Sequence, residues 1–285
     1  MSSASKKDIA DLFKKSGSAL GLDEASSDIL IHNLNAGNLP MCQLSPFTDE
    51  EKETDDFRLI HFGFDGSSSM DSVGDDLIAS VNDVVIPGLL GGAADQVGAI
   101  RVGGLVFNHT VRSLWQSGGD SGFYPLTQFP KLTKADYRPS GSTALNQAVL
   151  DSVTATTAMA LQVRRRTGTN PESVIAFFSD GANNQDPKDS DDVFQVLSKL
   201  SPELFTLVFV GFETFERVDF NAIALSLGFR DVLDSKLQPG ETVDDQRKRF
   251  RNVMKVFSGS LTKRASQSLV GSSMPAKGSG TGFWK

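Results

Sequence analysis

The chain has 285 residues, 39% of them hydrophobic and 22% charged, which is typical of a globular protein with enough apolar residues to bury a core. Its formal net charge is -7 and its basic clusters are short, so we expect no nucleic acid as its main partner. No apolar run reaches the ~18 residues that cross a bilayer, so we expect no membrane partner. The single cysteine, Cys42, cannot form an intrachain disulfide, so an oxidising compartment is not needed and we expect a cytoplasmic protein.

Residues 1–56 predict an N-terminal extension that is polar and partly helical. The spacing of Ile9, Leu12 and Phe13 places them on one helix face, and a second helix is expected to begin at Asp23 or Ser26. The first residues contain no apolar stretch of the kind found in secretion signals.

Residues 57–258 alternate strand and helix patterns, which predicts an α/β domain. Strands are expected at residues 58–64, 98–107, 110–115, 173–178 and 204–210, and helices at residues 75–85, 143–162, 191–200, 219–227 and 243–257. Runs that are apolar on both faces favour a doubly wound, mostly parallel six-stranded sheet of the Rossmann type. Residues 98–115 are expected to form a hairpin at its edge, and the Gly-rich stretch Gly88–Gly92 is expected to be a loop.

The C-terminal segment, residues 259–285, has the Ser- and Gly-rich composition of a disordered tail. It ends with an aromatic pair, Phe283 and Trp284, which we interpret as a possible docking peptide for a partner protein. The basic clusters Arg164–Arg166 and Arg247–Arg251 are interpreted as solvated helix faces, because they could neutralise few phosphates.

Polar residues gather where the predicted strands end. Asp65 follows the first strand and leads into Ser67 and Ser69, and Asp180 follows the strand at residues 173–178. Thr143 stands at the start of the long helix between them. Ligands of an open α/β sheet bind beyond the carboxyl ends of the strands, so these side chains are expected to converge on one rim.

This group of oxygen-bearing side chains suits a hard divalent cation. Mg²⁺ takes about six oxygen ligands in a near-octahedral arrangement, and three hydroxyls with two carboxylates can supply part of that shell. The alternate spacing of Asp65, Ser67 and Ser69 lets all three point the same way as the chain leaves the strand. With only two protein carboxylates, the ion stays electrophilic enough to attract an external carboxylate.

The pattern resembles the metal-ion-dependent adhesion site of von Willebrand factor type A (VWA) domains. The resemblance rests on Asp65-x-Ser67-x-Ser69, then Thr143, then Asp180-Gly181, in the same order, spacing and strand-end placement. It covers about residues 57–258, while the extension before the first strand is not a usual part of these domains. The segment DYRPSGSTAL also resembles the single-domain bacterial and viral branch of the family.

The resemblance implies that Ser67, Ser69 and Thr143 are hydroxyl ligands, and that Asp65 and Asp180 bind the ion directly or through water. The ion would be Mg²⁺, or else Mn²⁺ or Ca²⁺.

The function that the resemblance implies is protein binding without catalysis. An Asp or Glu of another protein would complete the metal shell, and that partner could be an AAA+ ATPase or a larger assembly. We expect the rim residues to contact the partner, namely Met70, Gly141, Ser142, Gly181 and Asn183.

Several alternatives remain open. The chain could be a structural subunit of a virion or cellular machine in which the metal is a folding staple, or a hydrolase that uses the metal to activate water. An aspartyl phosphotransferase is disfavoured because Ser67 stands where a second acid is needed. Asp65 and Ser69 could also serve only to cap the following helix, and Asp180 only to make a turn. The wide spacing of His32, His61 and His109 disfavours a zinc site.

Overall fold

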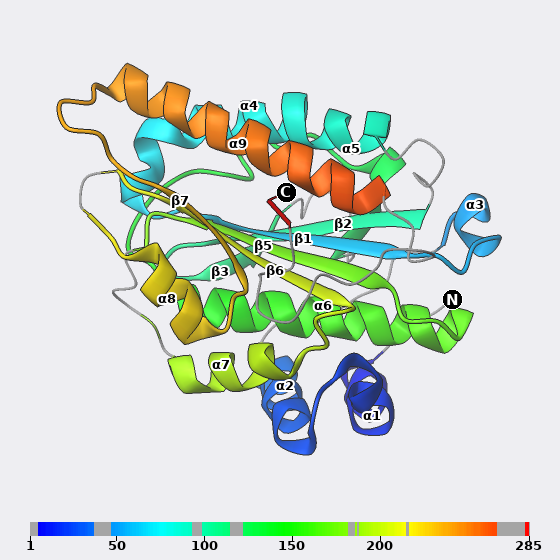
Figure 1. Ribbon diagram of the computed structural model, residues 1–285. Coiled ribbons are helices and arrows are strands. Elements are labelled where there is room, and N and C mark those ends of the chain that lie inside the picture. Colours follow the sequence, from blue (N-terminus) through cyan, green and yellow to red (C-terminus); the bar gives the residue numbers. More distant parts are fainter. Residues whose placement is uncertain are drawn as a thin grey trace.

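A mixed sheet forms the centre of the molecule and helices cover both of its faces (Figure 1). The computed structural model describes residues 5–36, 47–92, 99–114, 122–181, 186, 188–214, 217–266 and 283–284. This arrangement confirms the expected doubly wound, mostly parallel α/β architecture.

The sheet has seven strands among the residues described, in the order β3-β2-β1-β5-β6-β7, with β4 also paired to β2. The strands are β1 (Arg58–Asp65), β2 (Ile100–Phe107), β3 (Val111–Ser113), β4 (Phe123–Pro125), β5 (Glu172–Ser179), β6 (Phe205–Phe212) and β7 (Asp231–Ser235). β3 and β4 run antiparallel to β2, and the other pairs are parallel. The predicted hairpin is therefore confirmed. The described sheet has one strand more than the six expected, and β4 and β7 both lie outside the five ranges predicted from the sequence.

One face of the sheet is covered by a continuous helical segment and by the last long helix. The segment comprises the 3₁₀ turn η3 (Ser68–Val73), α4 (Gly74–Ser80), the π-helical turn η4 (Val81–Val85) and α5 (Ile86–Gly92), and it packs beside α9 (Val243–Ser266). The predicted loop at Gly88–Gly92 is wrong, because these residues continue the helix. Added Cβ atoms at Gly88 and Gly92 would lie 2.8 Å from Ser258 Oγ and 2.0 Å from Thr262 Cγ2 of α9, so these glycines permit close helix packing.

The opposite face is covered by α6 (Leu145–Thr167), α7 (Ser190–Lys199) and α8 (Phe220–Leu227). Most of α6 is buried, including hydroxyl residues such as Thr154 and Thr157. Their hydroxyls donate to the carbonyls of Leu150 and Val153 within the same helix, at 2.7 and 2.6 Å, which satisfies them without solvent. The single turn η7 (Leu126–Gln128) follows β4.

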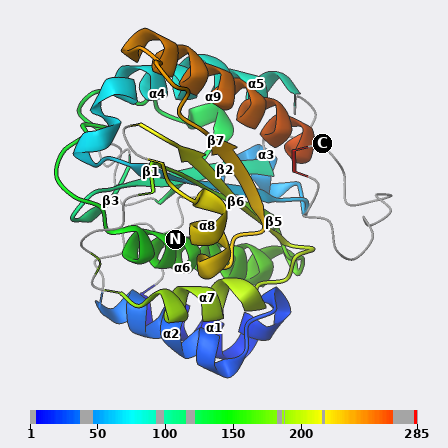
Figure 2. The ribbon, with the colours of Figure 1, turned by 60° about the vertical axis from the view of Figure 1, so that its left-hand side comes forward.

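The N-terminal extension forms a further layer beneath α6 and α7 (Figure 2). It contains α1 (Lys6–Ser16), η1 (Gly17–Leu20) and α2 (Glu24–Ala36), and α3 (Asp49–Lys52) precedes β1. Ile9 and Phe13 are buried in the same apolar cluster as α6. Asn33 Nδ2 donates to Asp151 Oδ1 at 2.8 Å and to Thr154 Oγ1 at 3.0 Å. The extension is therefore part of the α/β core and not a separate appendage.

The C-terminal region differs from the sequence expectation in two respects. α9 continues to Ser266, beyond the predicted boundary at residue 258. Phe283 is only 4% exposed and packs on Phe257 of α9, with ring centroids 5.9 Å apart. Phe283 thus completes this chain's own core, and the interpretation of Phe283 and Trp284 as a freely displayed docking peptide is corrected.

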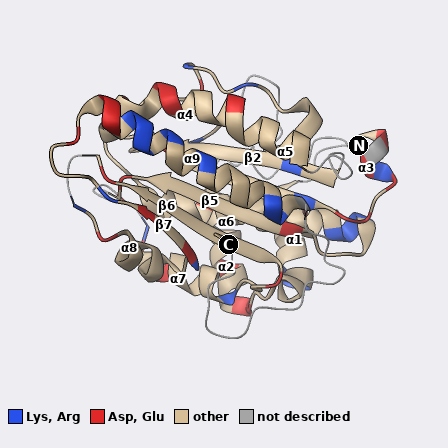
Figure 3. Cartoon of the chain, turned by 45° about the horizontal axis from the view of Figure 1, so that its top comes forward, with Lys and Arg blue, Asp and Glu red and all other residues tan. Residues whose placement is uncertain are grey.

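Lys and Arg residues are spaced along α9 (Figure 3), and its basic cluster forms ion pairs with acidic groups of this chain. Arg247 and Arg251 both pair with Asp76 of α4, and Arg249 pairs with Glu241. The side chains of Arg247 and Arg251 are still 40% and 46% exposed, so the cluster is solvated as expected and is also paired within the chain. Within the described ranges, no helix combines the length and apolar character needed to cross a bilayer.

Because α1 and α6 share one apolar cluster, we expect the extension to contribute to the stability of the whole domain. Phe13→Ala should lower the free energy of unfolding by about 3–5 kcal/mol, because it opens a cavity against α6. Asp11→Ala, at an exposed position of the same helix, should change it by less than about 0.5 kcal/mol. Urea titration monitored by circular dichroism compares the two, and equal effects would show that the extension does not stabilise the domain.

Candidate metal centre

The carboxyl ends of β1 and β5 bring the two predicted aspartates to the same edge of the sheet. The parallel register pairs Phe64 with Phe178, which places Asp65 beside Ser179 and next to Asp180. Asp65 and Asp180 are both buried, at 0% and 5% exposure. The sequence prediction that these carboxylates approach each other agrees with this placement.

Hydrogen bonds fix the orientation of Asp65. Its Oδ1 accepts from the backbone N–H of Ser67 at 2.9 Å, and its Oδ2 accepts from the Ser179 hydroxyl at 2.6 Å. The Tyr137 hydroxyl donates to the Asp65 carbonyl at 2.6 Å. The Gly181 N–H in turn donates to Ser179 Oγ at 3.0 Å, so Ser179 links the ends of β1 and β5.

The two predicted serine ligands lie together in the loop after β1. Ser67 has an extended backbone conformation immediately before the 3₁₀ turn η3. The Ser67 and Ser69 hydroxyl oxygens are 2.9 Å apart, within hydrogen-bond distance, so the two side chains lie on the same side of the loop. Ser67 is buried and Ser69 is half-buried.

The loop that carries Thr143 is joined to the β1 loop by backbone hydrogen bonds. The Ser140 N–H donates to the Gly66 carbonyl at 2.7 Å, and the Ser68 N–H donates to the Gly141 carbonyl at 3.1 Å. Thr143 is buried two residues further along, directly before α6. The structure thus joins the three predicted loops.

Asp180 has one carboxylate oxygen satisfied and one available. Its Oδ2 accepts from the Thr214 hydroxyl at 3.0 Å, whereas its Oδ1 is buried and has no hydrogen-bond partner in the part of the chain that the structure describes. Within those same residues, neither Asp65 nor Asp180 forms an ion pair with Lys, Arg or His. Burial and the neighbouring Asp180 charge together raise the pKa of Asp65 from 3.8 to about 7.

The donor set fits a hard cation. Carboxylate and hydroxyl oxygens are the ligands that Mg²⁺ and Ca²⁺ prefer, and the unsatisfied Asp180 Oδ1 is an oxygen that a cation could use. Across the described ranges, no group of three or more His, Cys, Asp and Glu side chains is placed to hold a metal. His61 is fully buried, with Nδ1 2.7 Å from Ser152 Oγ. A soft or imidazole-rich zinc site therefore does not fit this position.

The residues expected to contact a partner differ in how exposed they are to solvent. Gly141 is exposed, with a positive φ of 74° that brings its backbone against His109, and Ser142 is half-buried. Gly181 is buried. Met70 is fully buried in the core, so its side chain is not available to a partner and its expected role is corrected. Asn183 lies outside the described residues.

Several residues of the site were not identified from the sequence. Ser179 and Thr214 each donate a hydroxyl hydrogen bond to one of the aspartates, and Tyr137 donates to the Asp65 backbone. The strand-end rule would have found Thr214 if the strand had been extended beyond residue 210, because β6 ends at Phe212. Tyr137 has no local signal in the sequence, since only the fold brings it to β1.

Comparisons with known proteins show distant structural likeness only. No protein-family model matches the chain, and no curated protein matches it. Among solved structures it is similar to the PilB minor pilin from Streptococcus sanguinis, with a TM-score of 0.47, 12% identity, and coverage of 72% of this chain and 62% of that one. It is also similar to the pilus adhesin SpaC from Lactobacillus rhamnosus GG in an open conformation, with a TM-score of 0.43, 11% identity, and coverage of 74% and 30%.

A von Willebrand factor type A protein from Catenulispora acidiphila gives a TM-score of 0.37 and 14% identity over 71% of this chain and 43% of that one. The chain thus spans 62% or less of each of these three structures.

The raised pKa of Asp65 predicts how the stability of the metal-free protein depends on pH. Folded Asp65 keeps its proton up to about pH 7, whereas the unfolded group loses it near 3.8. The proton on Asp65 therefore stabilises the folded protein fully below pH 3.8, and this stabilisation is lost as the pH rises to about 7. The loss lowers the free energy of unfolding by up to about 4 kcal/mol.

Chemical denaturation in a chelator between pH 4 and pH 8 measures this loss, and Asp65→Asn serves as the reference because it cannot titrate. The wild-type protein should lose stability relative to Asp65→Asn across this window. Parallel pH profiles for the two proteins would contradict the assigned environment of Asp65.

Proposed function

We propose that the chain is a metal-dependent protein-binding domain of the VWA type, in which Asp65, Ser67, Ser69, Thr143 and Asp180 hold a divalent cation. The observation that carries the proposal is the pair of buried aspartates with no Lys, Arg or His ion-pair partner in the described part of the chain. A buried carboxylate without a counter-charge costs several kcal/mol, and a cation between two such groups would remove that cost.

The ion would be Mg²⁺, or else Mn²⁺ or Ca²⁺, and it would supply positive charge at the carboxyl edge of the sheet in an acidic protein. The residues of this chain would hold and orient it. Ser67 and Ser69 would supply neutral oxygens, and Ser179 and Thr214 would keep the two aspartates in position through their hydrogen bonds. The small number of charged ligands would leave the ion able to accept an Asp or Glu from a partner protein.

We propose no catalytic role for the site. By the VWA resemblance, the partner would be another protein, such as an AAA+ ATPase or a larger assembly, and with a single cysteine the cytoplasm is the proposed location. In the alternative of a structural subunit, the same ion would only staple the loops together. The binding domain and the structural subunit differ in whether binding of another protein requires the metal.

Removal of one aspartate charge should separate metal binding from folding. Asp180→Asn should abolish Mg²⁺ binding measured by isothermal titration calorimetry, because it removes one of the two carboxylates. The same variant should be at least as stable as the wild-type protein in a chelator, since it removes the repulsion that raises the pKa of Asp65.

Asp75→Asn provides a matched control, because Asp75 is an exposed carboxylate that pairs with exposed Lys134. It should bind Mg²⁺ as the wild-type protein does. Normal Mg²⁺ binding by Asp180→Asn would rule out the assigned site.

The proposed binding mode also predicts metal-dependent capture of partners. An immobilised wild-type chain should retain a set of partner proteins in Mg²⁺ and lose that set in chelator. Immobilised Asp180→Asn should fail to retain the same set even in Mg²⁺. Mass spectrometry of the three eluates identifies them. Retention that is unaffected by chelator and by the substitution would favour the structural-subunit alternative.

A further inference from the structure

An open hollow of about 380 Å³ adjoins the candidate metal centre. Its lining includes Thr214 and Arg217 from the segment after β6, Gln238 and Glu241 from the segment after β7, and Gln246 from the first turn of α9. Thr214 belongs to both places, because its hydroxyl donates to Asp180 Oδ2 at 3.0 Å. A ligand that reaches the metal centre from this side would therefore pass over the hollow.

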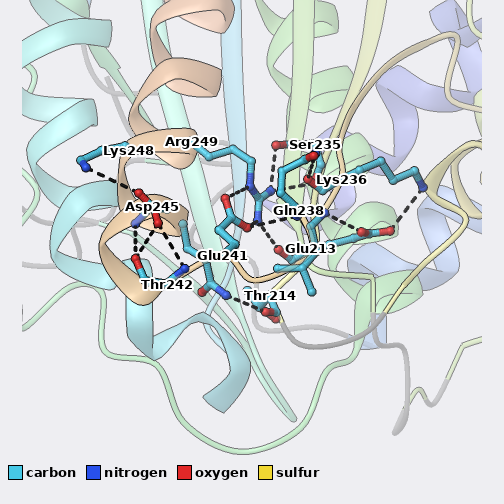
Figure 4. A network of polar contacts seen from close by, with 12 residues as sticks. Glu213, Thr214, Ser235, Lys236, Gln238, Glu241, Thr242, Asp245, Lys248 and Arg249 are labelled. Atoms are coloured by element: carbon cyan, nitrogen blue, oxygen red, sulfur yellow. Dashed lines mark hydrogen bonds and ion pairs between the residues drawn. The ribbon is translucent and has the colours of Figure 1, made fainter.

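Hydrogen bonds hold the walls of the hollow in place (Figure 4). Arg249 of α9 donates from Nε and Nη2 to the two carboxylate oxygens of Glu241, at 2.9 and 3.0 Å, and from Nη2 to the Glu213 carbonyl at 2.7 Å. Gln246 Nε2 donates to the Thr214 carbonyl at 3.1 Å. The bidentate pair neutralises Glu241 and fixes the loop before α9 against the end of β6.

Arg217 gives the hollow its net charge. Its side chain is exposed on the lining, and among the residues that the structure describes it forms no hydrogen bond or ion pair. Because Glu241 is already paired with Arg249, Arg217 leaves the hollow positively charged in a chain whose formal net charge is -7. A planar guanidinium in this setting suits a carboxylate, which it can bind through two parallel hydrogen bonds.

We propose that this hollow binds a second carboxylate of the partner. The recognised element is then an acidic peptide segment with two carboxylates, one directed to the Asp65–Asp180 centre and one to Arg217. This inference rests on the proposed function and specifies its partner. A polyphosphate chain fits less well, because one arginine neutralises little of its charge.

Synthetic peptides test the inference directly. The reference peptide is capped at both ends and carries a single Asp among glycines. Four further peptides keep this Asp and add one Glu, placed one, two, three or four residues after it. In Mg²⁺, the best two-acid peptide should bind the wild-type chain about threefold to fivefold more tightly than the one-acid peptide, as expected for one exposed ion pair. Calorimetry or nuclear magnetic resonance titration measures both affinities.

Arg217→Ala should remove this gain and leave the affinity for the one-acid peptide unchanged. Lys248→Ala is the matched control, because it removes an exposed cation of α9 that pairs with Asp245 and does not line the hollow. The inference is overturned if no position of Glu gives a gain, or if the gain survives in Arg217→Ala. Failure of even the one-acid peptide to bind in a Mg²⁺-dependent manner would instead overturn the proposed function.

Discussion

The proximity of two buried carboxylates is the constraint on which the whole account depends. The parallel pairing of β1 and β5 brings Asp65 beside Ser179 and close to Asp180, and burial of both carboxylates makes their charges costly. The structure shows one response to this cost in the raised pKa of Asp65, which favours a proton on that group. A divalent cation is the other response, and the serine hydroxyls beside it are the neutral oxygens that such an ion needs.

The rest of the fold holds these loops in register. α6 begins directly after the loop of Thr143, and Asp186 accepts hydrogen bonds from the backbone N–H groups of Asn146 and Gln147 in its first turn. The N-terminal extension covers the far side of α6, so the helix is buried between the sheet and a further helical layer. The extension therefore stabilises the scaffold that presents the site, although it lies away from the site itself.

The main elements and the three site loops could be predicted from local patterns. Apolar runs that end in Asp65 and Asp180 indicate buried parallel strands with polar residues at their carboxyl ends, and the structure has this arrangement. The sequence does not reveal β7, because its five residues are only partly buried and carry two aspartates. The helical conformation of Gly88 and Gly92 was also missed, because their role depends on contact with α9.

The remaining site residues depend on tertiary contacts in the same way. Tyr137 and Thr214 approach Asp65 and Asp180 from segments that are distant in the sequence, and no local spacing predicts that meeting. The burial of Phe283 likewise depends on its contact with Phe257 of α9 and not on the composition of the tail. Sequence patterns thus predicted the strand ends and the polar residues that follow them, while tertiary contacts determine which of those side chains are buried and which are exposed.

A crystal of the protein soaked in Mn²⁺ and measured at an anomalous wavelength tests the central claim most directly. The account predicts one strong anomalous peak between the β1 and β5 loops, about 2.0–2.3 Å from the hydroxyl oxygens of Ser67 and Ser69 and within direct or water-mediated reach of the Asp180 carboxylate. The absence of a peak there, or a peak only elsewhere on the molecule, would contradict it.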